Sequence, residues 1–365
     1  MWRIFFVNES STAMINCVRM GTAHLATMTW KIAAAACAMA AVFGANVPMS
    51  SEAGHDRATW RAQYRRPAEI SFPESNPYSK AKSQLGRMLF FDPILSGSKV
   101  RSCATCHNPA LSWADGQPRA IGEKPLSLRS PTLLNVAWTP KLGWDGHFRD
   151  LEAVAFGPIT AAGNMNLPEK VLIERLSEIR GYTEAFAAAF GKPDISRRNV
   201  ELALATFERS IVAGEAPFDR WIKGDEAAIS EAAKRGFDLF NSKARCSSCH
   251  SGWTFTDSSF HDIGTAKDGD LGRGRLFPNS VKLRYAFKTP TLRDAARRAP
   301  YMHDGSVATL AAVIELYDRG GIERPSRSEQ IAPLGLSKDE KADLIAFLQT
   351  LNGAPDYISL PPLPR

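Results

Sequence analysis

The chain has 365 residues, with 44% hydrophobic and 23% charged residues and a formal net charge of +7 at neutral pH. These values are typical of a soluble globular protein rather than a disordered or fibrous one, and the length suffices for two domains. The basic residues form no cluster interleaved with aromatic ones, so nothing in the sequence indicates nucleic-acid binding.

An apolar run from Ile32 to Val47 follows Lys31 near the start of the chain. The run is short for a membrane span and suits the hydrophobic part of a secretory signal. We therefore expect residues 1–50 to act as a signal peptide or N-terminal anchor, and the protein to be periplasmic. Membrane contact is expected only if this segment is retained. Cys17 and Cys37 fall within it, which leaves four cysteines for the rest of the chain.

Those four cysteines belong to two copies of the pattern C-x-x-C-H. The first copy is Cys103, Cys106 and His107, and the second is Cys246, Cys249 and His250. In c-type haem attachment, two thiols a turn apart bond one porphyrin and the adjacent imidazole reaches the iron. We therefore predict two covalently bound haem c groups with His107 and His250 as iron ligands. A four-cysteine zinc site and a strained redox disulfide are the competing interpretations.

The surroundings of the two motifs are similar. Residues 85–107 and 234–250 each run from a glycine through an apolar helix, Leu-Phe and a short loop into the motif, which indicates an internal duplication. Apolar residues recur at helical spacing in Lys170–Phe190, Asn199–Val212 and Ser337–Leu351. Alternation typical of strands is nearly absent.

These patterns predict an all-α fold with two cytochrome-c-like haem domains related by pseudo-duplication. We place the N-terminal domain at 51–215 and the C-terminal domain at 216–365. Long loops containing glycine and proline connect the helices, as expected where haem covers one side of a small core. The polar segment 262–286 is expected to be an irregular surface excursion.

Further motifs occur in order between about residues 80 and 351, namely "LFFDPILSGS", "SPTLLNVAW", "WDGHFRDLE", "FERSI", "PFDRWIKGD", "CSSCHSGWTFTD", "FKTPTLRDAARRAPYMHDGS" and "TLAAVIELY". Together with the two haem motifs, they resemble the bacterial dihaem cytochrome c peroxidase and MauG superfamily. The resemblance implies that the N-terminal haem reacts with hydrogen peroxide and that the C-terminal haem relays electrons.

The resemblance also implies an electron relay between the haems and a particular state of the first iron. The tryptophan that lies between the haems matches Trp144 in "GWDG". Many of the peroxidases cap the first iron with a loop histidine, whereas the matching position here is Glu123. We therefore expect the first iron to have an open side without reductive activation.

The sixth ligand of the second iron is methionine in the peroxidases and tyrosine in MauG-like enzymes. Tyr317 in "VIELYDRGG" occupies the matching position, and Met302 competes with it. A phenolate favours oxidised iron and lowers the reduction potential, whereas a thioether raises it. His261 and His303 are expected to form hydrogen bonds to propionates or loops rather than to bind iron.

The distal pocket of the first haem departs from the pattern of the family. Pro158 is retained, but the glutamate that moves the proton during peroxide cleavage is replaced by Asn164, and an expected glutamine is Val154. An amide can donate a hydrogen bond but cannot take up a proton. His147 follows W-D-G where the family usually has arginine, and it is a candidate for propionate contact or proton transfer. Slow peroxide turnover is therefore expected.

Calcium commonly lies between the two haems in this superfamily, held by an asparagine and main-chain carbonyls. The matching positions here are Arg129 and Arg298. Because an arginine side chain offers no oxygen ligand, the sequence argues against calcium, and a guanidinium is a candidate to replace it.

Three functions remain open at this point. The first is a MauG-like oxidoreductase that reacts with hydrogen peroxide and uses high-valent iron to oxidise an aromatic, tryptophan-type residue of a periplasmic protein substrate. The second is a cytochrome c peroxidase that takes electrons from a small redox protein. The third is a non-catalytic dihaem electron carrier, which would need two six-coordinate irons. Glu123 and Tyr317 favour the first.

Overall fold

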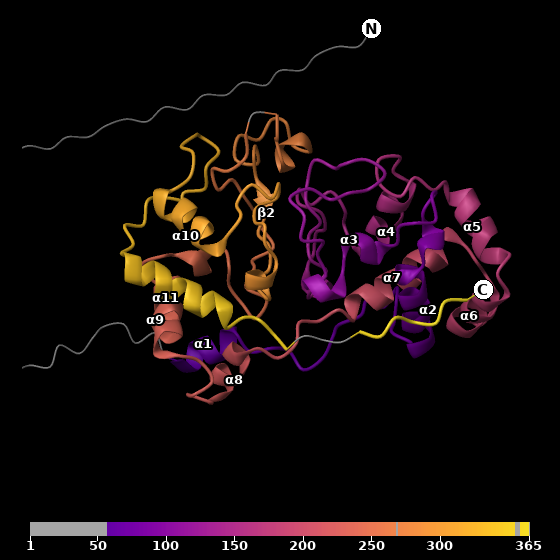
Figure 1. Ribbon diagram of the computed structural model, residues 1–365, viewed down its shortest axis with the longest axis horizontal. Coiled ribbons are helices and arrows are strands. Elements are labelled where there is room, and N and C mark those ends of the chain that lie inside the picture. The colour runs from indigo at the N-terminus through magenta and orange to yellow at the C-terminus, as the bar shows by residue number, and fades with distance from the viewer. Residues whose placement is uncertain (1–56, 268, 355–357, 365) are drawn as a thin grey trace, which may run out of the picture. The chain divides into compact units, whose positions relative to one another are not determined.

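The computed structural model describes residues 57–267, 269–354 and 358–364 (Figure 1). The predicted export segment 1–50 lies outside them. The α-helices are α1 (Arg57–Gln63), α2 (Lys80–Phe91), α3 (Cys103–Cys106), α4 (Leu151–Thr160), α5 (Glu169–Ser177), α6 (Arg180–Phe190), α7 (Arg197–Arg209), α8 (Pro217–Lys223), α9 (Glu231–Asn241), α10 (Leu310–Arg319) and α11 (Lys338–Gln349). Among the described residues, no helix combines the length and the apolar character that crossing a bilayer requires.

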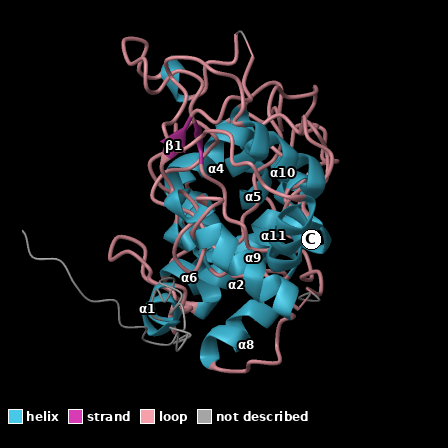
Figure 2. Ribbon diagram, turned by 90° about the vertical axis from the view of Figure 1, so that its left-hand side faces the viewer, coloured by secondary structure: helices cyan, strands magenta, loops and turns pink. Residues whose placement is uncertain are grey.

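Strand structure is confined, in the described part of the chain, to a two-stranded antiparallel sheet of β1 (Phe260–His261) and β2 (Phe287–Lys288). Short 3-10 turns fill the loops at Pro93–Leu95, Pro109–Leu111, Val136–Trp138, Cys246–Ser248, Arg273–Arg275 and Ala295–Arg297. Loops make up much of the upper part of the view around β1 (Figure 2). The prediction of an all-α fold with long loops is confirmed.

The first hydrophobic core forms where α2 and α7 pack against each other, with α4 and α6 at their sides. Leu85, Leu89 and Phe90 of α2 meet Leu204 and Phe207 of α7 in it. The serine before each of these helices caps its first turn, because its hydroxyl accepts a backbone N–H that has no partner within the helix. The two caps are Ser79 and Ser196.

The second core repeats this arrangement with α9 and α11. Phe237 and Phe240 of α9 pack with Phe347 of α11, edge to face or tilted. Ser230 caps α9, and Ser337 forms a capping box with Glu340 at the start of α11. Figure 1 shows α9, α10 and α11 in one half of the described structure and α2, α4, α5, α6 and α7 in the other.

A glycine marks the crossing of the helix pair in each core. At each crossing, a Cβ on the glycine would clash with a backbone carbonyl and touch a phenylalanine Cβ on the partner helix. The pairs are Gly86 with Ala203 and Phe207, and Gly236 with Asp343 and Phe347. The phenylalanine follows the carbonyl residue by four positions in both cases, so the two cores are built on the same helix crossing.

Each end of the described chain packs on the hydrophobic core that is distant from it in sequence, while the predicted domain boundaries remain a prediction. Tyr64, just after α1, is fully buried in the second core, and its hydroxyl donates to Asn241 Oδ1 at 3.0 Å. At the other end, Ile358 packs on the first core and Ser359 accepts a hydrogen bond from Arg87 of α2. Each end therefore packs on the domain that is distant in sequence, which Figure 1 shows for α1 beside α8 and for the C-terminal tail beside α6.

One predicted helix is broken in two. The periodic stretch Lys170–Phe190 forms α5 and α6, separated at Glu178 and Ile179. Ile179 is extended and precedes α6. The hydrophobic spacing continues through the break because both helices bury one face in the same core, with Leu172 on α5 and Phe186 on α6.

Candidate functional site

A cavity of about 960 Å³ is lined by residues of both domains. Its volume lies at the upper end of the range for cofactor sites. Every residue that the sequence assigned to the site borders it. They are Cys103, Cys106, His107, Trp144, His147, Pro158, Asn164, Cys246, Cys249, His250 and Tyr317. The fold brings these residues into one cavity, while their individual roles remain predictions.

The first haem motif is held by its own short helix. Cys103 and Cys106 begin and end the single turn α3, and the His107 N–H donates to Cys103 O at 2.9 Å. His107 Nδ1 lies 3.4 Å from Trp113 O. A carbonyl oxygen can only accept, so Nδ1 carries the proton and Nε2 keeps a lone pair for a metal.

The second motif uses the same arrangement. His250 Nδ1 lies 3.0 Å from Phe255 O, which again leaves Nε2 free. Trp113 and Phe255, the two acceptor residues, both have a left-handed backbone, with φ of 59° and 54°. Such values are uncommon for bulky residues, so their recurrence after both motifs supports the duplication.

The four thiols do not form a zinc site. Burial raises the pKa of Cys103 and Cys106, and raises that of Cys246 to about 12. The four cysteines are free, and the one set of three clustered potential metal ligands among the described residues contains only one cysteine. The zinc and disulfide interpretations are therefore wrong. Paired thiols, a histidine with a free Nε2 and a shared cavity fit haem c.

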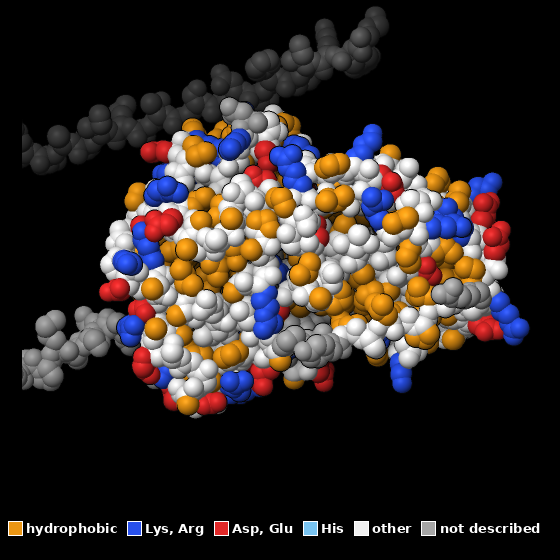
Figure 3. Space-filling view, in the orientation of Figure 1, with side chains coloured by type: hydrophobic (Ala, Val, Ile, Leu, Met, Phe, Trp, Pro, Cys, Tyr) orange, Lys and Arg blue, Asp and Glu red, His pale blue; other side chains and the backbone are white. Residues whose placement is uncertain are grey.

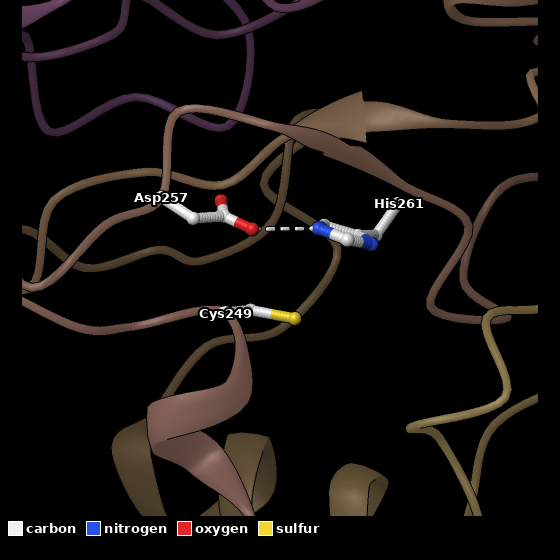
Figure 4. Close-up of side chains that lie close together, drawn as sticks. All are labelled: Cys249, Asp257 and His261. Carbon is white, nitrogen blue, oxygen red and sulfur yellow. Dashed lines mark hydrogen bonds and ion pairs between the residues drawn. The ribbon is translucent and has the colours of Figure 1, made fainter.

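Figure 4 shows that cluster, formed by Cys249, Asp257 and His261. His261 Nε2 lies 2.9 Å from Asp257 Oδ2, and this hydrogen bond raises the pKa of His261 to about 10, with a smaller contribution from Cys249. Once Cys249 is a thioether, it carries no charge and is a weak ligand, so the cluster reduces to a histidine–aspartate pair beside the second motif. His261 thus bonds a loop residue, one of the two outcomes expected for it.

Trp144 is fixed by several neighbours. Its indole Nε1 donates to Arg129 O at 2.9 Å, and its carbonyl accepts from Lys288 N at 2.8 Å. His303 lies edge to face with the indole at 6.5 Å between ring centroids and stacks on Phe287 at 3.7 Å. His303 Nε2 also bonds Asp270 at 2.7 Å, so this histidine serves as packing and hydrogen-bonding support.

Glu123 is held away from the cavity, which it does not line. Its carboxylate accepts from Ser98 and Arg101, each at 2.9 Å, and its N–H donates to Asn164 O at 2.8 Å. A carboxylate anchored in this way does not reach across the cavity towards His107. An open side at the first iron remains a prediction.

The predicted distal residues line the cavity from α4 and the loop that follows it. Pro158 lies within α4, and its carbonyl accepts from Met165 N at 3.1 Å, which folds the loop carrying Asn164 back onto the helix. The Asn164 side chain forms no hydrogen bond with other described residues. His147 is exposed at the rim, its ring against Phe148 at 4.9 Å.

Tyr317 reaches the cavity from α10. Burial raises the pKa of its hydroxyl, and within the described residues that hydroxyl has no hydrogen-bond partner. The side chain is partly exposed within the cavity, so a group held there can contact its hydroxyl. Met302 also lines the cavity, with a left-handed φ of 70°.

Sequence reasoning missed Glu208 of α7, which also lines the cavity. Its side chain is 8% exposed, and burial raises its pKa from 4.5 to about 8. The adjacent Arg209 does not neutralise it, because both guanidinium nitrogens bond Glu152 at 2.7 and 2.8 Å. Glu208 lies on an amphipathic helix, and its neighbours in the sequence do not distinguish it from a surface glutamate.

Comparisons with known proteins agree with this geometry. Residues 80–227 match the family model for di-haem cytochrome c peroxidase, and residues 233–352 match that for cytochrome c. The chain is 50% identical over 325 residues to the methylamine utilization protein MauG of Methylorubrum extorquens, covering 88% of this chain and 92% of that protein. This chain belongs to the dihaem cytochrome c peroxidase and MauG family.

Two further proteins match at lower identity. The cytochrome c551 peroxidase of Pseudomonas aeruginosa is 32% identical over 328 residues, covering 86% of this chain and 90% of that protein. A solved structure of a MauG-like protein associated with microbial copper homeostasis matches with a TM-score of 0.74 at 30% identity, covering 80% of this chain and 94% of that one. The chain is therefore a peroxidase-type oxidoreductase, as predicted, and its family implies two haem c groups.

Proposed function

We propose that this chain is a MauG-like enzyme that reacts with hydrogen peroxide and oxidises an aromatic, tryptophan-type side chain of a partner protein. The main support is Tyr317, whose side chain lines the cavity that contains the second motif. A tyrosine ligand favours storage of oxidising equivalents over rapid transfer of electrons to peroxide. The 50% identity to a protein named MauG supports the same choice.

When bound, the two haems supply the reaction with peroxide and hold the oxidising equivalents. The chain orients the groups around them. Trp144 is kept in one orientation by its hydrogen bond to Arg129 O and by the edge of His303, so its environment changes little when an electron leaves it. This is the property expected of an electron relay between the two sites.

The residues of the distal wall argue for slow peroxide cleavage. Asn164 can donate a hydrogen bond to a bound oxygen but cannot carry the proton away. His147 is a titratable group that lines the same cavity, and its exposed position at the rim suits exchange of protons with solvent. A slowly formed and long-lived oxidant suits a protein substrate that must first dock.

The relatives that are named cytochrome c peroxidases favour a second candidate, in which a small redox protein supplies electrons for peroxide reduction. Asn164 and Tyr317 weigh against it. In either case we place the partner protein in the periplasm, on the strength of the export segment predicted for residues 1–50. Lys, Arg, Asp and Glu side chains are interspersed on the face shown in Figure 3, and that face does not select between partners by charge.

The test is electron paramagnetic resonance of the ferric dihaem protein before and after one equivalent of hydrogen peroxide. We expect one high-spin and one low-spin haem, with both signals lost on peroxide addition and recovering slowly. Rapid recovery only when a reduced small redox protein is added would favour the peroxidase. Two low-spin haems that do not respond to peroxide would exclude both enzymes and indicate a non-catalytic electron carrier.

A further inference from the structure

Two buried arginines from different domains meet in the cavity. Arg129 and Arg298 are 7% and 9% exposed and both line it. Arg129 Nη2 donates to Arg298 O at 2.9 Å, and its backbone N–H donates to His303 O at 3.0 Å. Arg298 Nη2 donates to two carbonyls of the second domain, Thr291 O at 2.6 Å and Arg293 O at 2.9 Å.

No carboxylate neutralises these guanidinium groups among the described residues. Their side-chain hydrogen bonds go to backbone carbonyls, and the Nε of each has no partner. Two acidic groups lie near enough to influence them without forming an ion pair: Asp115 acts on Arg129, and Asp294 acts on Arg298. Asp294 is already used by Ser112 Oγ at 3.1 Å and by Gly353 N at 2.8 Å.

This pair of like charges is unfavourable as it stands. Burial, together with the neighbouring Arg129, lowers the pKa of Arg298 to about 10. Burial of a charge without a counterion costs several kcal/mol. An anion bound between the two guanidinium groups would offset this cost. The haem groups bring carboxylates into the cavity on their propionate side chains. A guanidinium matches a carboxylate with two parallel hydrogen bonds.

Calcium does not fit the same place. A calcium ion takes six to eight oxygen ligands, and guanidinium offers none. The carbonyl oxygens of Thr291, Arg293 and Arg298 already accept arginine N–H groups. A divalent cation here would also stand beside two positive charges.

We propose that Arg129 and Arg298 form a cationic pair that binds haem propionate and takes the place of a metal ion between the two haem sites. The dihaem protein then contains no calcium at this position and needs none. The proposal rests on the two haem groups of the family and not on the identity of the oxidised substrate. It therefore also holds if the partner protein is an electron donor.

The first test uses the wild-type dihaem protein. Its calcium content is measured by mass spectrometry after passage through metal-free buffer, and its paramagnetic resonance spectrum is recorded with and without the chelator EGTA. We expect well below one calcium per chain and an unchanged spectrum. One retained calcium per chain, with a spectrum that changes on its removal, would overturn the proposal.

The second test measures the reduction potentials of the haems in Arg129→Met and Arg298→Met. Loss of a positive charge beside a propionate disfavours the reduced haem, so the one-electron reduction equilibrium of at least one haem should fall about tenfold. Arg298→Lys, which keeps the charge, should shift less. Arg175→Met is the matched control, because Arg175 also donates only to carbonyls, those of Ile94, Ser96 and Gly97, and does not line the cavity. Shifts in reduction potential no larger than in that control would contradict propionate binding. The calcium measurement uses the wild-type protein, so it tests the proposal even if a variant fails to fold.

Discussion

Among single residues, Tyr317 carries the proposed function, as the expected sixth ligand of the second iron. We expect Tyr317→Met to raise the reduction potential of the second haem by on the order of 0.1 V, because a thioether replaces an anionic oxygen. The oxidised protein formed by peroxide should then decay faster. Potentiometry with optical detection checks the first effect and stopped-flow absorbance the second.

The matched control for this prediction is Tyr182→Phe. Tyr182 is also a buried tyrosine, but its hydroxyl donates to Asp92 at 2.8 Å inside the first core. The Tyr182→Phe variant should leave the reduction potentials of both haems unchanged. A Tyr317→Met protein with the wild-type spectrum and potential would show that Tyr317 is a packing residue and not a ligand.

Glu208 predicts a pH dependence of stability. Its pKa in the folded chain is about 8, above its ordinary value of 4.5, so between these values the folded state binds more protons than the unfolded state. The free energy of unfolding therefore falls as the pH rises through this window. The loss of stability caused by ionising Glu208 reaches its full value above pH 8. The charged groups near it are Arg209 and Glu152, which pair with each other.

We expect Glu208→Gln to remove this component. At pH 9 the variant should be more stable than the wild type by at least about 1.4 kcal/mol, the value of one pKa unit, and the difference should shrink towards pH 5. Guanidinium unfolding of the dihaem protein at both pH values checks it. Equal stability of the two proteins at pH 9 would mean that Glu208 is ionised and solvated there at no cost.

At the scale of elements, the helix crossings depend on their glycines. Alanine at Gly236 would gain about 1 kcal/mol of helix propensity, but its Cβ would clash with Asp343 O, and overpacking of this kind costs about 3 kcal/mol. We therefore expect Gly236→Ala to lower the free energy of unfolding by about 2 kcal/mol. Gly163→Ala is the control, because the nearest atom to a Cβ there is Leu126 Cδ2 at 3.9 Å. A Gly236→Ala variant as stable as this control would show that the crossing is adjustable.

Secondary structure was largely predictable from the sequence, because the amphipathic spacing of α7 and α11 is a local property. The break between α5 and α6 was not. Both helices bury one face in the same core, so the periodicity continues across Glu178 and Ile179 although the hydrogen-bonded helix does not.

At the scale of the whole molecule, the ends of the chain stabilise the opposite domains. Tyr64 precedes the first haem motif, yet it packs against Phe218, Phe237 and Phe255 in the second core. We expect Tyr64→Ala to destabilise the second domain by about 3–5 kcal/mol and Tyr64→Phe by about 1 kcal/mol, since the latter removes only the hydrogen bond to Asn241. Unfolding followed by the absorbance of each haem resolves the domain affected. A loss confined to the first haem would contradict the packing described.

Haem attachment was predictable from the sequence alone, because Cys103, Cys106 and His107, like their counterparts in the second copy, lie within one turn of chain. The other residues that line the cavity come together only in the folded chain. Whether Glu208 is charged and whether Arg129 and Arg298 lack a counterion depend on burial and pairing. Both are set by segments that lie far apart in the chain, so no local pattern records them.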